Sequence, residues 1–126
     1  IQIKNKKVTV LGRSFLVGGP IAKLMKEKGG KVTVCHSESK NNREKSQKAD
    51  ILISATGKKG LVKKAWTNPD QTIVDVGITK TKDGLRGDVD FGAVNKDVKA
   101  ISPVPGGVGP MTVLSLFENL IDSSLA

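Results

Sequence analysis

The feature that most constrains the fold is a glycine turn between a short apolar run and an amphipathic segment. The apolar run at 7–11 predicts a buried strand. A helix is expected from about residue 20 to 28, because Pro20 suits a first turn and apolar residues recur at helical spacing. A second run at 31–35 completes a strand–helix–strand unit, whose crossover is almost always right-handed and makes the strands parallel.

The same alternation continues along the chain. Residues 50–55, 72–76 and 100–102 are predicted as further strands, with short helical segments ending near residue 48 and around 62–66. An Asp-Gly pair within 79–87 predicts a hairpin, and a closing helix is expected from about residue 110. Alternating strands and helices indicate an α/β fold, and 126 residues fit one domain spanning 1–126.

The charge of the chain, +9 overall, is unevenly divided. Residues 1–64 carry sixteen Lys and Arg against four Asp and Glu, whereas residues 65–126 carry five against eight. A basic half indicates an anionic partner such as nucleic acid, a phosphorylated cofactor or acidic lipid, and a merely solvated surface is the alternative. Modules that read single-stranded nucleic acid usually add stacking aromatic residues, of which this chain has few, so a basic module binding nucleic acid or another polyanion is the second choice.

Rare residue types narrow the class further. One Cys forms no internal disulfide, and one Cys with one His cannot build a structural zinc site, so we expect an intracellular, cytoplasmic chain without a metal. We expect no membrane span, because no long apolar run is present, and no leader, because the start of the chain at 1–5 is polar and short. The absence of an initial Met indicates a processed chain or a fragment.

The turn between Gly12 and Gly18 is the first candidate site. In sheets of this kind, such a turn presents backbone N–H groups and a helix N-terminus to phosphate. The spacing Gly12-x-Ser14-x-x-x-Gly18 departs from the usual Gly-x-Gly-x-x-Gly, and a purely structural turn is the alternative. The strand before it and the helix after it favour a dinucleotide site.

The end of the second strand bears on the type of dinucleotide. His36 and Ser37 stand where an NAD site usually has an acidic residue, and Arg13 in the first turn suits a 2′-phosphate. These residues favour NADP, while Glu38 argues for NAD. We expect His36 to line the ribose pocket; the alternative is a general base.

Other reactive residue types are assigned simpler roles. Cys35 is expected in the core rather than as a nucleophile, and Asp75 at a strand end is compatible with a structural role. Four lysines form a cluster expected to be solvated: Lys58, Lys59, Lys63 and Lys64. Residues 103–112 hold three Gly and three Pro, which indicates a rigid loop facing a ligand rather than a connector.

Taken together, these segments resemble the bifunctional methylenetetrahydrofolate dehydrogenase/methenyltetrahydrofolate cyclohydrolase family. The matching motifs are Gly12-Arg13-Ser14-x-x-Val17-Gly18-x-Pro20, Val32-Thr33-Val34-Cys35-His36-Ser37, Asp75-Val76-Gly77-Ile78, Gly87-Asp88-Val89-Asp90-Phe91 and residues 103–112. The resemblance implies a doubly wound, Rossmann-like parallel sheet with strand order 2-1-3-4-5 and helices on both faces. It covers only the C-terminal, NAD(P)-binding half of the family's polypeptide.

The resemblance also implies a reaction and its residues. NADP accepts a hydride from methylenetetrahydrofolate, and water opens the product to formyltetrahydrofolate. The family's catalytic Lys and Tyr belong to an N-terminal domain, so no catalytic residue is expected in this chain, which has no Tyr. A homodimer and a place in one-carbon metabolism and purine biosynthesis are implied for the full protein. The implied cofactor-binding residues are Gly12, Arg13, Ser14, Val17, Gly18, His36, Ser37, Ala55, Thr56, Gly57, Val76, Gly77, Ile78 and Thr112, and the implied folate-binding residues are Pro105, Gly106, Gly107, Val108 and Gly109.

Overall fold

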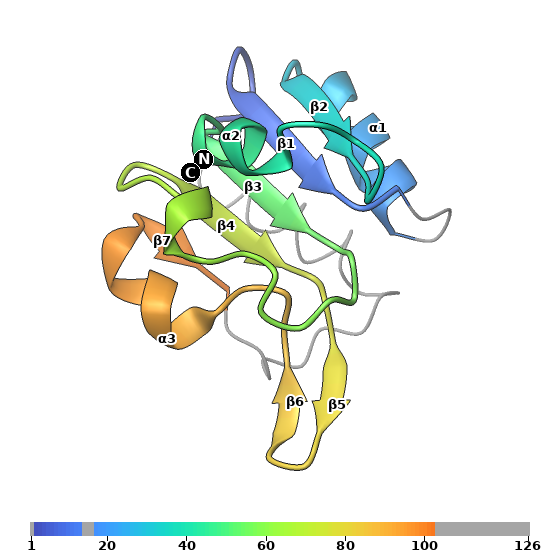
Figure 1. Ribbon diagram of the computed structural model, residues 1–126. Coiled ribbons are helices and arrows are strands. Elements are labelled where there is room, and N and C mark those ends of the chain that lie inside the picture. The colour runs from blue at the N-terminus through green and yellow to red at the C-terminus, as the bar shows by residue number, and fades with distance from the viewer. Residues whose placement is uncertain (1, 14–16, 103–126) are drawn as a thin grey trace.

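A five-stranded parallel sheet organises the chain (Figure 1). The computed structural model describes residues 2–13 and 17–102. The sheet has the order β2-β1-β3-β4-β7, and its strands are β1 (Lys7–Leu11), β2 (Lys31–Cys35), β3 (Ile51–Ser54), β4 (Thr72–Asp75) and β7 (Ala100–Ile101). Because β7 is the fifth strand of this sheet in chain order, the predicted order 2-1-3-4-5 is confirmed.

Helical segments cover both faces of the sheet (Figure 1). Helix α1 (Gly18–Glu27) packs on one face through Ile21, Ala22 and Met25. The opposite face carries α2 (Asn42–Gln47), η1 (Lys64–Trp66), α3 (Phe91–Val94) and η2 (Asn95–Asp97). The predicted doubly wound architecture is therefore confirmed.

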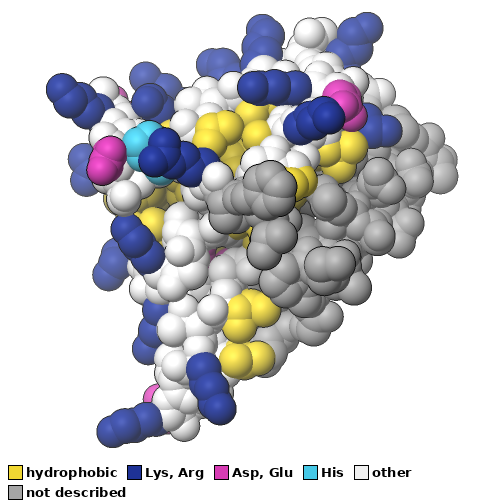
Figure 2. Space-filling model, turned by 90° about the vertical axis from the view of Figure 1, so that its right-hand side faces the viewer, with side chains coloured by type: hydrophobic (Ala, Val, Ile, Leu, Met, Phe, Trp, Pro, Cys, Tyr) yellow, Lys and Arg dark blue, Asp and Glu magenta, His cyan; other side chains and the backbone are white. Residues whose placement is uncertain are grey.

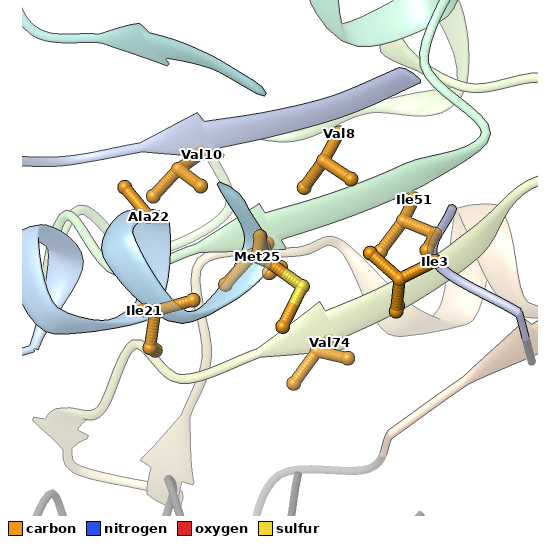
Figure 3. Packing of buried hydrophobic residues seen from close by; sticks show 9 residues of the cluster. Ile3, Val8, Val10, Ile21, Ala22, Met25, Ile51 and Val74 are labelled. Carbon is orange, nitrogen blue, oxygen red and sulfur yellow. The ribbon is translucent and has the colours of Figure 1, made fainter. Parts of the chain in front are cut away.

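Two apolar clusters form the core, one on each face of the sheet. Alternate residues of β3 divide between them. Ile51 (Figure 3) and Ile53 belong to the cluster that contains α1, whereas Leu52 belongs to the cluster of Val62 and Val94. A central parallel strand buried on both faces requires such an unbroken apolar run. Each fully buried aliphatic side chain contributes about 1.5–3 kcal/mol.

A hairpin projects from the end of β4 (Figure 1). Strands β5 (Thr79–Thr81) and β6 (Gly84–Arg86) pair antiparallel and form a separate sheet, which confirms the predicted hairpin. After β6, Val89 forms an isolated parallel bridge with Val62, outside the strands of the main sheet.

Boundaries and one short element differ from the predictions. Helix α1 begins at Gly18 rather than near residue 20, which places Pro20 third in its first turn. The helical turn predicted at 62–66 covers only 64–66, because Val62 pairs with Val89 instead. Helix α3 with η2 was not predicted, since its few residues show no helical periodicity. The predicted loop at 103–112 and closing helix lie outside the described residues.

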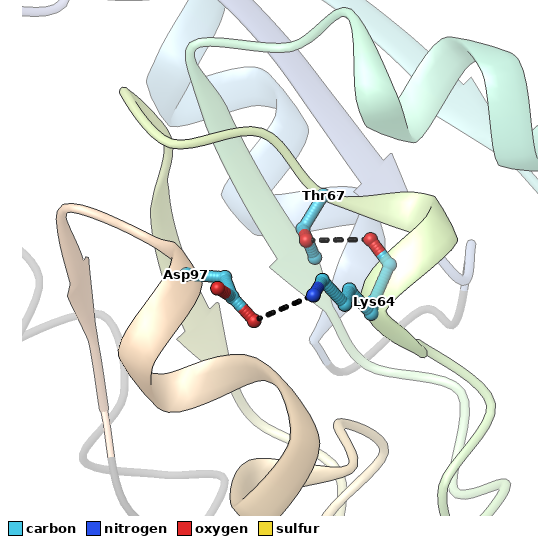
Figure 4. Close-up of polar contacts among 3 residues, drawn as sticks. All are labelled: Lys64, Thr67 and Asp97. Carbon is cyan, nitrogen blue, oxygen red and sulfur yellow. Dashed lines mark hydrogen bonds and ion pairs between the residues drawn. The ribbon is translucent and has the colours of Figure 1, made fainter.

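Segments η1 and η2 meet at the surface (Figure 4). Lys64 Nζ lies 3.6 Å from Asp97 Oδ2, with the side chains 72% and 41% exposed. Thr67 Oγ1 donates a hydrogen bond of 2.8 Å to the Lys64 carbonyl. An exposed pair of this kind contributes little to stability. Of the helices described, none is long and apolar enough to cross a membrane.

Candidate functional site

The strand register places the predicted cofactor residues along one edge of the sheet. Leu11 pairs with Cys35 and with Ser54, and Ser54 pairs with Asp75, so these four last strand residues lie in one row. The next residues in the chain are Gly12, His36, Ala55 and Val76. Strand order reverses between β1 and β3, and open α/β sheets bind ligands beyond the carboxyl ends at such a point.

The turn after β1 is too tight for side chains at two positions. Gly12 has φ +103°, and a Cβ there would overlap the carbonyl of Ala55. A Cβ on Gly18 would overlap the Gly12 carbonyl, so the start of α1 approaches the end of β1 directly. These are the tight turn and the close helix–strand packing that a dinucleotide fingerprint requires of glycine.

The start of α1 suits an anion. Its first turn contains no acidic side chain, and the partial positive charge of a ten-residue helix favours phosphate there. Arg13, one residue after Gly12, is exposed. These residues fit a dinucleotide phosphate, and Ser14, between Arg13 and α1, lies outside the described residues.

The turn after β2 is held by its own hydrogen bonds. His36 Nδ1 accepts a bond of 3.2 Å from the Glu38 N–H, and the His36 carbonyl accepts one of 2.9 Å from Asn42 Nδ2. Ser37, which favours NADP, and Glu38, which argues for NAD, are both exposed in this turn, whereas His36 is partly buried. One imidazole nitrogen is thus occupied in shaping the turn, which favours a lining role for His36 over proton transfer.

Two further turns complete the edge. Ala55 and Thr56 are partly buried and Gly57 is exposed after β3, where Gly57 has φ +71°. Gly77 is buried and Ile78 is 43% exposed after β4. Thr79 Oγ1 donates to the Gly57 carbonyl at 3.2 Å, which joins the two turns at the base of the hairpin.

Two carboxylates lie behind these turns, and sequence reasoning gave Asp88 no role. Asp88 is fully buried, and its Oδ2 accepts bonds from Ser54 Oγ, the Thr56 N–H and Thr56 Oγ1 at 2.7–2.8 Å. Asp75 accepts bonds from the N–H groups of Gly77, Asp88 and Val89 at 3.0–3.1 Å. Except for Gly77, which follows Asp75 by two residues, each donor lies 13 to 34 residues along the chain from the carboxylate that it bonds. No local sequence signal therefore indicates these bonds.

Burial raises the pKa of Asp75 from 3.8 to about 6, and the Asp88 carboxylate adds to the rise. The backbone N–H donors of Val89, Asp88 and Gly77 favour the ionised form and limit the shift. The folded chain therefore binds a proton at Asp75 more tightly than the unfolded chain does between about pH 4 and 6. Stability contributed by this group falls as the pH rises through that window.

A pocket of about 550 Å³ adjoins Asp75 on the α3 side of the edge. Its lining brings together the cations Lys59, Lys63 and Arg86 and the carboxylates of Asp75 and Asp90. All four residues of the predicted solvated cluster, 58, 59, 63 and 64, are exposed, as predicted. Two of them nevertheless contribute to the pocket rather than only to the outer surface.

Cys35 lies in the core, as predicted. Only 1% of it is exposed, and burial raises the pKa of its thiol while nearby Lys45 opposes the rise. A protonated, buried thiol is a poor nucleophile. Within residues 2–13 and 17–102, no three His, Cys, Asp or Glu side chains cluster as metal ligands.

Of the remaining predicted site residues, Val17 is partly buried and packs against the core cluster that contains α1, and the others are not placed by the structure. Thr112 and the five predicted folate-binding residues 105–109 lie outside the described part of the chain.

Figure 2 shows the face toward which the strands point, where Lys and Arg side chains spread along the margins instead of gathering in one patch. The described edge thus offers a tight glycine turn, a helix N-terminus, a basic side chain and three flanking turns. That combination suits an extended phosphorylated ligand.

Comparison with known proteins agrees with this geometry. The family model for tetrahydrofolate dehydrogenase/cyclohydrolase, NAD(P)-binding domain, matches residues 1–126. The bifunctional protein FolD of Methanospirillum hungatei is 48% identical over 122 residues, covering 97% of this chain and 44% of that protein. The chain therefore spans less than half the length of the curated relatives it matches.

Two solved structures share the fold closely. The bifunctional FolD methylenetetrahydrofolate dehydrogenase/cyclohydrolase of Campylobacter jejuni has a TM-score of 0.85 and 39% identity, covering 98% of this chain and 44% of that one. The Trypanosoma brucei N5,N10-methylenetetrahydrofolate dehydrogenase-cyclohydrolase, solved with NADP and an inhibitor, has a TM-score of 0.81 and 38% identity, covering 96% and 44%.

Proposed function

Since this chain belongs to the tetrahydrofolate dehydrogenase/cyclohydrolase family and corresponds to its NAD(P)-binding domain, we propose that it forms the NADP-binding half of a two-domain enzyme. The whole protein would oxidise methylenetetrahydrofolate to methenyltetrahydrofolate and hydrolyse that product to formyltetrahydrofolate. The observation that carries the proposal is the glycine turn at the carboxyl edge, where Gly12 and Gly18 leave no room for side chains beside an anion-favouring helix start.

Different described residues are proposed to hold different parts of the cofactor. When bound, the cofactor supplies the hydride acceptor. Arg13 offers a planar, permanently charged donor for a 2′-phosphate, and His36 and Ser37 flank the ribose. The turns 55–57 and 76–78 form the next part of the cradle. Ser14 and Thr112 are proposed to complete the cofactor site, and residues 105–109 the folate side, on the strength of the family motifs.

We propose that the whole protein is a cytoplasmic homodimer acting in one-carbon metabolism and purine biosynthesis. The names of the relatives support the folate chemistry. The location, the homodimer and the link to purine biosynthesis are proposed from the family resemblance. Residues 1–126 form one cofactor domain, and an N-terminal domain supplies the catalytic Lys and Tyr. We expect no turnover by the chain alone, because half a cleft does not orient folate against nicotinamide.

Ligand-dependent stability tests the cofactor. NADP at a hundred times its Kd adds about 2.7 kcal/mol to the free energy of unfolding, which raises the melting temperature by several degrees. NAD is expected to give less, and an oligonucleotide none. Oligonucleotide binding with a steep salt dependence and no effect of NADP would instead support the basic-module alternative.

Arg13→Ala tests the phosphate contact. Loss of a charge-assisted hydrogen bond costs about 1.5–3 kcal/mol, so NADP affinity should fall roughly 10- to 100-fold while NAD affinity changes little. Lys82→Ala is the matched control, since Lys82 is an exposed cation in the hairpin turn. Equal losses for NADP and NAD would contradict the assignment of Arg13.

A chimera tests the reaction. The chain would replace the matching domain of the Campylobacter jejuni enzyme, and NADP-dependent oxidation of methylenetetrahydrofolate would be measured. Activity in the chimera and none in the isolated chain are expected. A chimera that folds and binds NADP but does not react would refute the proposed pairing of domains.

A further inference from the structure

Asp88 is an acidic residue whose side chain is fully buried. Its Oδ2 accepts three hydrogen bonds of 2.7–2.8 Å, one from Ser54 Oγ in β3 and two from Thr56, through its N–H and its Oγ1. Burial of a carboxylate is costly unless donors replace its hydration. A single oxygen atom therefore fixes the conformation of the turn that follows β3.

The other oxygen of Asp88 faces the turn that follows β4. Oδ1 has no hydrogen-bond partner among the described residues, and it lies so close to Gly77 that a Cβ at that position would overlap it. Because the φ of Gly77 is not in the left-handed region, lack of room, and not backbone conformation, requires glycine there. The Asp88 carboxylate thus stands between the two turns and spaces them.

Asp75 links the turn after β4 to the backbone of Asp88. It ends β4, and its Oδ1 accepts bonds from the N–H groups of Gly77 at 3.0 Å and Asp88 at 3.1 Å. Its Oδ2 accepts a bond of 3.0 Å from the Val89 N–H. Asp75 therefore holds the backbone of Asp88 in place, while the side chain of Asp88 holds the turn after β3.

We propose that Asp88 is a positioning residue for the cofactor site, acting with Asp75 to hold turns 55–57 and 76–78 at a fixed spacing that sets the affinity for the dinucleotide. The inference rests on the proposed function, because it takes these two turns to face the cofactor. Because Asp88 is fully buried, it would act through Thr56 and Gly77 and not through contact with the cofactor or folate. In catalysis, a misplacement of about 1 Å can cost about a hundredfold in rate, which shows how strongly function can depend on the spacing of such groups.

Asp88→Asn is the principal test, because it keeps the size of the side chain. The amide oxygen is a weaker acceptor than a carboxylate, and the new NH₂ group must face either Gly77 or the donors of Thr56. Asp83→Asn is the matched control, since Asp83 is exposed in the hairpin turn. The measurements are the Kd for NADP, the melting temperature, and the hydrogen exchange of the Thr56 and Gly77 amides without ligand.

We expect Asp88→Asn to weaken NADP binding by about tenfold or more and to speed exchange at both amides. Asp83→Asn should change neither. If Asp88→Asn lowers only the melting temperature and leaves the Kd unchanged well below that temperature, Asp88 is a structural residue and the inference is wrong. Unchanged exchange at Thr56 and Gly77 overturns it without reference to any ligand, whereas a wild-type chain that does not bind NADP refutes the proposed function.

Ser54→Ala keeps the inference testable if Asp88→Asn does not fold. Ser54 lies within β3 and is not a proposed cofactor residue, and the change removes one of the three donors to Asp88 Oδ2. NADP binding should weaken in the same direction but less. Unchanged affinity for NADP in Ser54→Ala would contradict the role of Asp88.

Discussion

The close contact between Gly12 and Ala55 predicts an unusually large effect of adding one methyl group. Gly12→Ala places a Cβ into the Ala55 carbonyl and forces a side chain into φ +103°. The backbone conformation alone costs about 1–3 kcal/mol. Relief of the overlap must move the chain next to the 2.8 Å bond from the Ala55 N–H to the Leu11 carbonyl, and loss of a buried bond adds about 1–3 kcal/mol. We expect Gly12→Ala to lower the free energy of unfolding by about 2–6 kcal/mol, the sum of the two contributions.

Two other glycines separate these contributions. Gly60 has φ +66° but no heavy atom within 4 Å of an added Cβ, so Gly60→Ala reports conformational strain alone, about 1–2 kcal/mol. Gly18 has no positive φ, yet its Cβ would overlap the Gly12 backbone, so Gly18→Ala reports the overlap alone. The entropy that alanine removes from the unfolded chain is similar in all three variants and cancels when they are compared.

Urea unfolding followed by the fluorescence of Trp66 and by far-ultraviolet circular dichroism gives the free energies. The expected order of destabilisation is Gly12→Ala greatest and Gly60→Ala least. A typical domain has a total stability of about 5–15 kcal/mol, so the differences are measurable. If Gly12→Ala destabilises the chain no more than Gly60→Ala does, the end of β1 does not approach β3 as closely as described, and the reasoning fails.

Two electrostatic predictions follow from the same structure. As the pH rises from 4 to 6, the free energy of unfolding of the wild-type chain should fall by about 1–2 kcal/mol more than that of Asp75→Asn. The pKa shift of Asp75 sets an upper limit near 3 kcal/mol, which the partial solvent exposure of this residue reduces. Urea unfolding at several pH values measures this, and a flat or opposite difference would show that burial does not raise the pKa of Asp75. Lys64→Ala should change stability by less than about 0.5 kcal/mol, because its pair with Asp97 is long and exposed (Figure 4); a loss above about 1 kcal/mol in thermal unfolding would contradict this.

The strands were predictable because their signal is local. The apolar runs at 7–11 and 51–54 must be buried, and a strand–helix–strand unit leaves little choice of topology once its handedness is set. Exact ends were not predictable in the same way. Residues 55, 76 and 102 continue the apolar or strand-like pattern, but they leave the sheet, and the first two enter the turns of the site.

The residues of the candidate site also differ in whether a local sequence signal predicts them. Gly12 and Gly18 were recognisable, because a glycine between a strand and a helix has a specific steric meaning. Asp88 was not, because its donors Ser54 and Thr56 stand 34 and 32 residues earlier in the chain. Only the paired register of β3 and β4 brings the two turns to the same edge, and a buried carboxylate between them has no local signature.

The excess of positive charge in residues 1–64 does not by itself show which of its cations would bind phosphate. Lys7 and Lys31 begin β1 and β2, and with Lys45 and Lys48 they line a groove of about 400 Å³. Four residue steps of about 3.3 Å separate Lys7 from the carboxyl end of β1, so it lies about 13 Å from the edge where Gly12 stands. Screening at physiological ionic strength acts over about 8 Å, so these lysines add little to the local affinity for phosphate. Under the proposed function, preference for NADP over NAD then depends on the few polar groups at the edge itself. Arg13 is proposed as the chief of these, which is why its removal should separate the two cofactors.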